Sequence, residues 1–171
     1  MERLRSKIRD IPDFPKPGIV FKDITPLLRD PAALHLAVQQ LLHPFIGGNL
    51  TAVAGIEARG FIFGALVARE LGLGFVPLRK PGKLPYDVRS IDYELEYGSA
   101  ALEVHLDAVG KGDRVLIIDD LLATGGTAKA SCELLESLGA EVAALAFVVE
   151  LDFLKGREKL GPYPIHSLLN Y

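Results

Sequence analysis

The residues best suited to chemistry lie in one segment, Val115-Leu-Ile-Ile-Asp-Asp-Leu-Leu-Ala-Thr-Gly-Gly-Thr127. Two adjacent carboxylates, Asp119 and Asp120, follow four apolar residues, and Gly125 and Gly126 lie in a loop of small residues. Glycine lets the backbone adopt angles that a side chain forbids and approach a ligand closely. The helix predicted after this loop presents unpaired N–H groups and a partial positive charge, so its N-terminus suits a phosphate monoester.

The two aspartates narrow the choice of ligand further. Carboxylates beside a phosphate site repel an anion unless they accept hydrogen bonds from sugar hydroxyls or support a magnesium ion nearby. A ribose 5-phosphate meets these requirements, and the hydroxyls of Thr124 and Thr127 can donate to its phosphate. The alternative is structural, with an Asp-Asp pair that ends a strand and caps a helix. For the complete string we favour the sugar phosphate.

These residues need a framework, and the pattern of apolar residues predicts an α/β fold. Helical spacing predicts helices at about 31–43, 60–71 and 125–138, and apolar runs predict strands at about 50–56, 73–78, 100–106, 114–119 and 141–149. The strand–helix–strand order over 114–149 implies a parallel sheet, whose ligands gather at the carboxyl ends of strands. Residues 11–18 are too rich in proline for a helix, and residues 79–98 read as a long mobile loop or hairpin.

Composition and charge limit the class of protein. The chain has 171 residues, 49% of them hydrophobic, and no repeat or linker, so we expect one domain over residues 1–171. A net charge of −3 argues against nucleic acid as a partner, and no apolar run approaches the roughly 20 residues that cross a membrane. Cys132 is the only cysteine and residues 1–10 lack an apolar signal segment, so we expect a cytoplasmic location.

Two further groups could contact an anionic substrate. Residues 57–60 (Glu-Ala-Arg-Gly) follow a predicted strand, and the Arg59 guanidinium can hold an anionic oxygen with paired hydrogen bonds. Arg79, Lys80 and Lys83 form a basic cluster after another predicted strand. Each group has a simpler interpretation as solvated surface charge. Their place after strands favours a role at the same edge of the sheet.

The remaining candidates are a carboxylic acid and an aromatic ring. A carboxyl group in a closed, dry site has a raised pKa and can donate a proton to a nucleobase or accept one from it. Glu94 and Glu96 are both candidates for this role. Phe21 follows the proline-rich segment and could stack on a flat ring or fill the core. The four histidines lack metal-ligand spacing, and neither a Walker loop nor a Gly-x-Ser-x-Gly elbow occurs, so zinc, kinase and hydrolase chemistry lack support.

Several motifs together resemble the type I phosphoribosyltransferases. The segment at 115–127 resembles their phosphoribosyl pyrophosphate (PRPP) signature, and Leu121-Leu-Ala123 within it resembles the adenine-specific members. The likeness continues in FPKPGIVFKD (14–23), GIEARGF (55–61), RKPGKLP (79–85), YELEYG (93–98) and VEL (149–151). It implies a mostly parallel twisted sheet flanked by helices, a small hood to which residues 1–30 contribute, and a mobile catalytic loop.

The resemblance also implies roles for individual residues. Ribose hydroxyls would contact Asp119 and Asp120, and the 5′-phosphate would contact Ala123, Thr124, Gly125, Gly126 and Thr127. Pyrophosphate would contact Glu57, Ala58, Arg59, Arg79, Lys83 and Tyr97, with a cis peptide between Glu57 and Ala58. Adenine would contact Val20, Phe21, Lys22, Leu121, Ala123 and Leu151. Glu96 would be the acid/base group and Arg59 a second catalytic residue.

The implied reaction is purine salvage, in which a nitrogen of adenine displaces pyrophosphate from PRPP to give AMP. We expect Mg²⁺ to be carried mainly by PRPP, near Asp119 and Asp120, without a certain set of protein ligands. A homodimer is expected from the family. The alternatives are the same chemistry on hypoxanthine, guanine or xanthine, and a ligand-sensing regulator that has lost catalysis. Residues 86–92 match no pattern and receive no role.

Overall fold

The centre of the structure is a parallel sheet that is buried on both faces. The computed structural model describes residues 1–94 and 98–171. Within them five parallel strands pair in the order β4-β3-β7-β8-β9, namely β3 (Ala52–Ile56), β4 (Gly74–Leu78), β7 (Arg114–Leu122), β8 (Glu141–Glu150) and β9 (Ile165–Asn170). Because helices and a hairpin cover both faces, the inner strands are apolar along most of their length.

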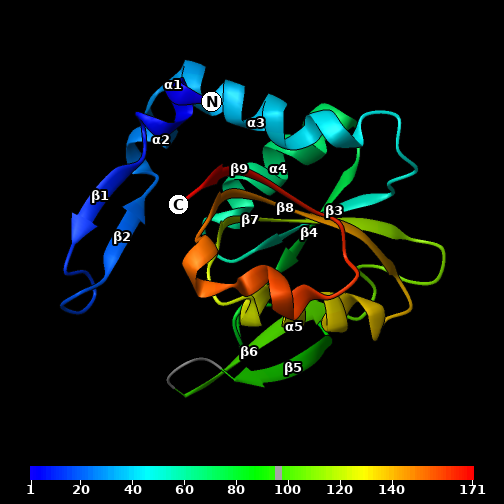
Figure 1. Cartoon of the computed structure of the whole chain (residues 1–171). Helices are drawn as coiled ribbons and strands as arrows, with labels where there is room; N and C mark the ends of the chain where they lie inside the picture. Colours follow the sequence, from blue (N-terminus) through cyan, green and yellow to red (C-terminus); the bar gives the residue numbers. More distant parts are fainter. Residues whose placement is uncertain (95–97) are drawn as a thin grey trace.

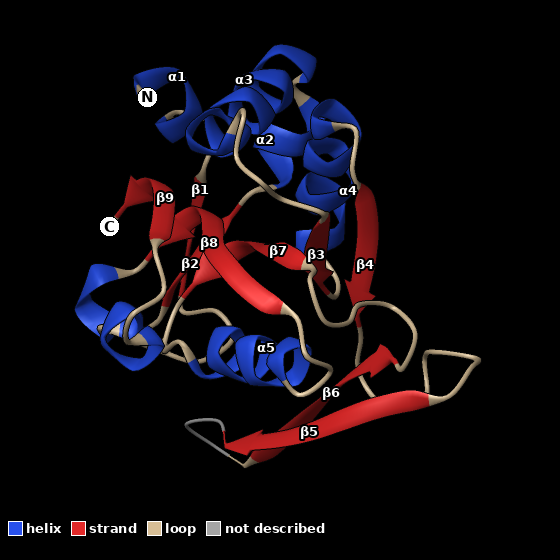
Figure 2. Ribbon diagram, turned by 90° about the vertical axis from the view of Figure 1, so that its right-hand side faces the viewer, coloured by secondary structure: helices blue, strands red, loops and turns tan. Residues whose placement is uncertain are grey.

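The two faces of the sheet carry different layers (Figures 1 and 2). One face packs against α3 (Pro31–Leu42) and α4 (Gly60–Leu71), and the short helices α1 (Glu2–Arg5) and α2 (Thr25–Arg29) lie on the same side and contact α3. The other packs against α5 (Gly126–Glu136) and the antiparallel hairpin of β5 (Val88–Glu94) and β6 (Ser99–His105). Neighbouring strand residues point to opposite faces, so Leu116 joins the first hydrophobic cluster and Ile117 the second.

Local sequence signals explain where the long helices begin and end. The Asp30 carboxylate accepts hydrogen bonds from the N–H groups of Ala32 and Ala33, both at 3.1 Å, and so caps α3. Gly72 ends α4 in the left-handed region, with φ of 68°. Gly125 precedes α5 with φ of 81°, a value that favours glycine. These ends position the loops on which the site depends.

A second hairpin stands away from the sheet near the N-terminus (Figure 1). It pairs β1 (Arg9–Pro12) with β2 (Val20–Asp23), and we call residues 9–23 the hood. Short 3-10 segments complete the description: η1 (His43–Phe45), η2 (Asp152–Leu154) and η3 (Gly156–Leu160). The cis peptide bonds are Phe14–Pro15, in the hood, and Glu57–Ala58, at the carboxyl end of β3.

The predicted fold class is confirmed, and the predicted elements occur close to their expected places. Strand β7 is longer than predicted and continues through Asp119 and Asp120 to Leu122. The reason is that the long β8 pairs with it as far as Glu150. The segment predicted as a loop or hairpin contains β5. The sequence patterns did not predict β1, β2, β9, the short helices α1 and α2, or the 3-10 segments.

Two observations bear on the excluded classes of protein. None of the helices in the described ranges is both long and apolar enough to cross a membrane. Cys132 lies inside α5 with no exposed surface, so the thiol packs in the core as expected. Burial there raises the pKa of the Cys132 thiol to about 12, which leaves it an unreactive thiol at neutral pH.

Candidate active site

Two adjoining cavities open at the carboxyl ends of β3 and β7. The larger has a volume of about 450 Å³ and is lined by Ile56, Glu57, Ala58, Arg59, Lys80, Tyr93, Ala100, Leu102, Asp119, Asp120 and Thr127. The smaller, of about 80 Å³, is lined by Asp119 and by residues 121–128. Asp119 and Thr127 line both cavities, so the two form one continuous site at the edge where parallel sheets bind ligands.

The paired aspartates have different surroundings. Asp120, with a side chain only 6% exposed, accepts a 2.5 Å hydrogen bond from Nε of Arg59, and its own N–H donates to Oδ1 of Asp119. A β-carbon added at Gly60 would lie 2.8 Å from Oδ1 of Asp119 and from the carbonyl oxygen of Ile118. Glycine at the start of α4 is therefore what allows this close approach to β7.

The charges of this cluster follow from burial and contact. Burial and the neighbouring Asp120 charge raise the pKa of Asp119 well above the ordinary value of 3.8. Burial alone would lower the pKa of Arg59, but the Asp120 carboxylate outweighs it and raises that pKa. Arg59 thus stays cationic beside the Asp120 side chain, and burial favours the protonated form of Asp119. Such a cluster can both accept from and donate to sugar hydroxyls.

The smaller cavity lies at the N-terminus of α5. Residues 123–127 wrap around it, with the left-handed Gly125 as the turn before the helix. The first N–H groups of a helix lack partners within the helix, and its dipole favours an anion. The hydroxyl of Thr127 donates to the Tyr93 hydroxyl at 3.3 Å, which joins the β5–β6 hairpin to this loop. The loop therefore has the geometry of an anion site, and its binding of a phosphate stays a prediction.

Among the described residues, Arg79 joins the predicted pyrophosphate residues Glu57 and Lys83 by an arrangement that the sequence did not indicate. Nε and Nη2 of Arg79 donate to the two carboxylate oxygens of Glu57 at 3.1 and 3.3 Å, and Nη1 of Arg79 donates to the Lys83 carbonyl. The Lys80 N–H donates to the same carboxylate at 3.0 Å. Hydrogen bonding to Arg79 is the main cause that lowers the pKa of Glu57, against the effect of burial. Lys80, rather than Arg79 or Lys83, lines the cavity.

The predicted base-binding residues are divided between the hood and the sheet. The ring centroid of Phe21 lies 5.7 Å from the Arg59 guanidinium carbon, so the hood reaches the aspartate cluster. The Lys22 ammonium pairs with Asp10 at 2.7 Å and lies 4.0 Å from the centroid of the Tyr171 ring. The exposed Val20 belongs to the hood. Leu121 and Ala123 line the smaller cavity, and the buried Leu151 donates its N–H to the Leu122 carbonyl.

Some site residues escaped the sequence analysis and others cannot be placed. Tyr93, Ala100 and Leu102 line the larger cavity from the β5–β6 hairpin. Alternation along β6 could have indicated Leu102 and Ala100, since they point to one face. Glu96 and Tyr97, the predicted acid/base group and pyrophosphate contact, lie outside the described residues.

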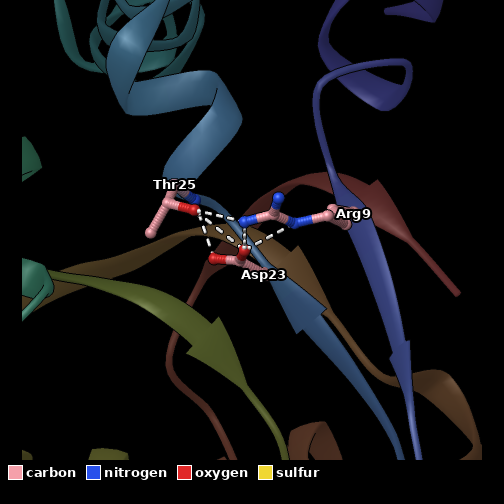
Figure 3. Close-up of polar contacts among 3 residues, drawn as sticks. All are labelled: Arg9, Asp23 and Thr25. Carbon is pink, nitrogen blue, oxygen red and sulfur yellow. Dashed lines mark hydrogen bonds and ion pairs between the residues drawn. The ribbon is translucent and has the colours of Figure 1, made fainter.

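A larger cavity, of about 700 Å³, lies between Lys7, the hood, α2 and the start of α3. It is lined by Lys7, Arg9, Thr25, Pro26, Arg29, Asp30 and Pro31. Most of its charges satisfy one another: Lys7 pairs with Asp30 at 2.8 Å, and Arg9 donates to Asp23 and Thr25 (Figure 3). The bond from Arg9 to Thr25 attaches the hood to α2. The two smaller cavities at the sheet edge are the better candidate for chemistry, because they bring together Asp119, Asp120, Arg59 and the N-terminus of α5.

Comparisons with known proteins agree with this geometry. The family model "Phosphoribosyl transferase domain" matches residues 28–162. The adenine phosphoribosyltransferases of Methylococcus capsulatus and Nitrosococcus oceani are 76% and 75% identical over 171 residues, covering all of both chains. The solved adenine phosphoribosyltransferase of Thermoanaerobacter pseudethanolicus is 54% identical with a TM-score of 0.96, covering 99% of both chains. The Giardia lamblia enzyme, complexed with 9-deazaadenine, is 41% identical with a TM-score of 0.94, covering 99% of this chain and 97% of its own.

Proposed function

Because the chain belongs to the phosphoribosyl transferase family, as an adenine phosphoribosyltransferase, we propose that it forms AMP at the cavity between β3, β7 and the β5–β6 hairpin. The reaction joins adenine to PRPP and releases pyrophosphate. The observation that carries this assignment is the juxtaposition of Asp119, Asp120 and Arg59 with the glycine-rich entrance to α5. A sugar phosphate needs hydroxyl partners and an anion site close together, and the cavity shared by Asp119 and residues 121–128 supports the proposal.

The ribose and its 5′-phosphate take the two parts of the site. Asp119 and Asp120 orient the ribose hydroxyls, and the hydrogen bond from Arg59 holds the Asp120 carboxylate in place. The backbone of residues 123–127 binds the 5′-phosphate, with Thr124 and Thr127 as hydroxyl donors. Fixing both ends of the sugar aligns its anomeric carbon for in-line displacement, and this positioning is a large part of the catalysis.

The departing pyrophosphate lies along residues 57–59 and the basic cluster. Arg59 and Lys80 line the cavity there, while Arg79 and Lys83 add positive charge beside it. Glu57, Ala58 and Tyr97 complete the proposed contacts. Positive charge aimed at the leaving group favours the transition state, in which negative charge develops on pyrophosphate. Glu96 is the proposed acid/base group for the adenine ring; it and Tyr97 are assigned through the family resemblance.

A magnesium ion fits this site as a companion of PRPP. The described parts of the chain contain no group of three or more His, Cys, Asp and Glu side chains that could enclose a metal, but Asp119 lies at the shared cavity wall. Magnesium in such sites uses one or two carboxylates together with substrate phosphates. When bound, it supplies positive charge to the pyrophosphate oxygens.

Adenine lies between the hood and the end of the sheet. Val20 and Phe21 cover one side of the ring, and Leu121, Ala123 and Leu151 form the other. The Lys22 side chain is engaged by Asp10 and Tyr171, so this residue acts through its backbone. A site without a charged base-reading side chain suits the neutral edge of adenine. Residues 1–30 contribute to the hood of a single domain, and the enzyme works as a cytoplasmic homodimer.

The test is an assay of AMP formation from adenine, PRPP and Mg²⁺, with hypoxanthine, guanine and xanthine as competing bases. We expect turnover with adenine and, at most, slow turnover with the other purines. Absence of AMP from the folded protein would refute the activity. Glu96→Gln tests the acid/base role separately, since normal turnover by that variant would refute this role and leave the reaction intact. Size-exclusion chromatography with light scattering tests the homodimer.

A further inference from the structure

The segment that follows β8 turns back along the end of β7. We call residues 151–157 the strap. It begins with the Leu151 N–H, which donates to the Leu122 carbonyl at 2.9 Å, and passes through η2 into η3. Figure 1 shows this orange segment beside α5, and contacts between η3 and α5 agree. The strap therefore touches the two ends of the loop that leads into α5.

The second contact joins backbone to backbone. A β-carbon added at Gly156 would collide with the carbonyl oxygen of Ala123 and would lie 3.0 Å from the Gly125 nitrogen. A β-carbon added at Gly125 would collide in turn with the Gly156 carbonyl oxygen. Backbone atoms cannot swing aside as the end of a long side chain can, so both positions exclude any side chain. The strap and the proposed phosphate loop interlock through two glycines.

A buried carboxylate fixes the strap directly after Gly156. Nε and Nη2 of Arg157 donate to the two oxygens of Glu150 at 2.9 and 2.6 Å, in a fork-to-fork pair. The Glu150 side chain is only 5% exposed, and the Ser167 hydroxyl donates to it at 2.5 Å. Nη1 of Arg157 donates to the Ile165 carbonyl at 3.2 Å. Strands β8 and β9 thus hold the residue that follows Gly156.

We propose that the strap is a positioning element for the phosphoribosyl substrate, and that Gly156 and the Glu150–Arg157 pair hold residues 123–127 in their anion-binding shape before substrate arrives. A loop that is preorganised in this way does not lose binding energy to its own ordering. The inference rests on the proposed 5′-phosphate site. It assigns a function to Glu150, Gly156 and Arg157, none of which belongs to the proposed contacts of the base or the pyrophosphate.

The main test is Gly156→Ala, with Gly110→Ala as the matched control. Gly110 has no heavy atom near an added β-carbon and no left-handed backbone, so its variant should behave as wild type. We expect Gly156→Ala to raise the KM for PRPP and the Kd for ribose 5-phosphate by about tenfold or more, since small misplacements of binding groups have effects of this size. The KM for adenine should change less than about twofold. An unchanged Kd for ribose 5-phosphate would overturn the proposal.

A second variant decides the matter if Gly156→Ala does not fold. Arg157→Lys keeps the positive charge but loses the paired hydrogen bonds to the Glu150 carboxylate. The strap therefore keeps its backbone contacts but is held less firmly at residue 157. We expect the Kd for ribose 5-phosphate to rise about threefold to tenfold with kcat at saturating PRPP nearly unchanged. A loss of kcat with unaltered binding of ribose 5-phosphate would instead indicate a general structural role and contradict the proposal.

Thr127→Val separates this inference from the proposed function. Thr127 belongs to the phosphate loop itself, so its variant must weaken binding of ribose 5-phosphate if the loop binds the phosphate. If Thr127→Val weakens binding and the strap variants do not, the strap inference is wrong and the phosphate site stands. If none of the three variants affects ribose 5-phosphate, the phosphate binds elsewhere and both proposals are wrong.

Discussion

The phosphate loop and the hood serve opposite ends of the same reactants, and different forces hold them. The loop is fixed by backbone contact between Gly125 and Gly156. The two strands of the hood are joined to each other by partly exposed ion pairs, Arg9 with Asp23 and Lys22 with Asp10. Close packing does not depend on salt, whereas exposed ion pairs are weak and screened. One end of the site is therefore rigid, and the other can adjust to its ligand.

The largest expected effect comes from the cluster between these two regions. Arg59→Ala removes the partner of the buried Asp120 carboxylate and a cation from the pyrophosphate cavity. We expect kcat/KM to fall about 10²–10³-fold, the range seen when a donor to developing charge is lost. Because Arg59 is half exposed, stability should fall by only about 1–2 kcal/mol. Steady-state kinetics with both substrates measures the first effect, and thermal unfolding the second.

Arg59→Lys is the control for this prediction. It keeps a cation but replaces the guanidinium by a point charge, so activity should recover only in part. Full activity in a folded Arg59→Ala protein would contradict the assigned role.

The next effect compares two glycines with similar backbone angles in the two regions. Gly125 and Gly18 have φ of 81° and 86°, but only Gly125 has backbone atoms within contact of an added β-carbon. Gly125→Ala should cost about 3 kcal/mol, or about 6–12 °C in melting temperature, through strain and collision together. Gly18→Ala in the hood should cost about 1 kcal/mol, from the angle alone. Equal losses in calorimetry would contradict the contrast between a packed loop and an open hood.

A smaller effect concerns the pH dependence of stability. The pKa of Asp119 is raised from 3.8 in the folded protein, chiefly by burial. Above pH 4, up to the raised pKa, the folded state holds more protons than the unfolded chain, so stability falls as pH rises. Asp119→Asn should remove this decline and stabilise the protein at neutral pH by about 1–2 kcal/mol, while reducing activity. Urea unfolding of both proteins between pH 4 and 8 measures the free energy of unfolding at each pH. If that free energy falls with pH as steeply in Asp119→Asn as in the wild type, Asp119 is not the titrating group.

The smallest effect lies at Arg9, whose exposed guanidinium joins the two strands of the hood and also donates to Thr25 of α2. Arg9→Ala removes the fork to Asp23 shown in Figure 3. With an Arg9 side chain that is 58% exposed, stability should change by less than about 1 kcal/mol. The KM for adenine should rise about twofold to threefold, less so in high salt, with the KM for PRPP unchanged. A larger change in the KM for PRPP than in the KM for adenine would contradict the assignment of the base to the hood and of the phosphate to the loop.

The sequence predicted the site best where local chemistry decides the structure. Asp30 and Gly72 mark helix ends by their own properties, and the string from Asp119 to Thr127 carries its strand, turn and helix entrance in consecutive residues. Contacts between distant residues were not predictable in the same way. Nothing near Gly156 indicates which backbone it meets.

The basic cluster illustrates the same limit. Its charges predicted an anion site, but the assignment of individual cations depends on the pairing of Arg79 with Glu57, 22 residues away. Only the folded chain shows that Lys80 lines the cavity. Strand β9 was missed for a related reason, because its short, partly polar run is stabilised by pairing with β8.

The paired glycines at 125 and 156 also limit how this enzyme can be redesigned. Since neither position admits even a methyl group, substitutions there cannot reshape the pocket for a different sugar phosphate. The hood tolerates new side chains far more readily, since Val20 is exposed and the two hood strands are joined by a partly exposed ion pair. Mutant libraries that seek a changed nucleobase preference should therefore vary residues of the hood. They should keep Gly125 and Gly156 unchanged.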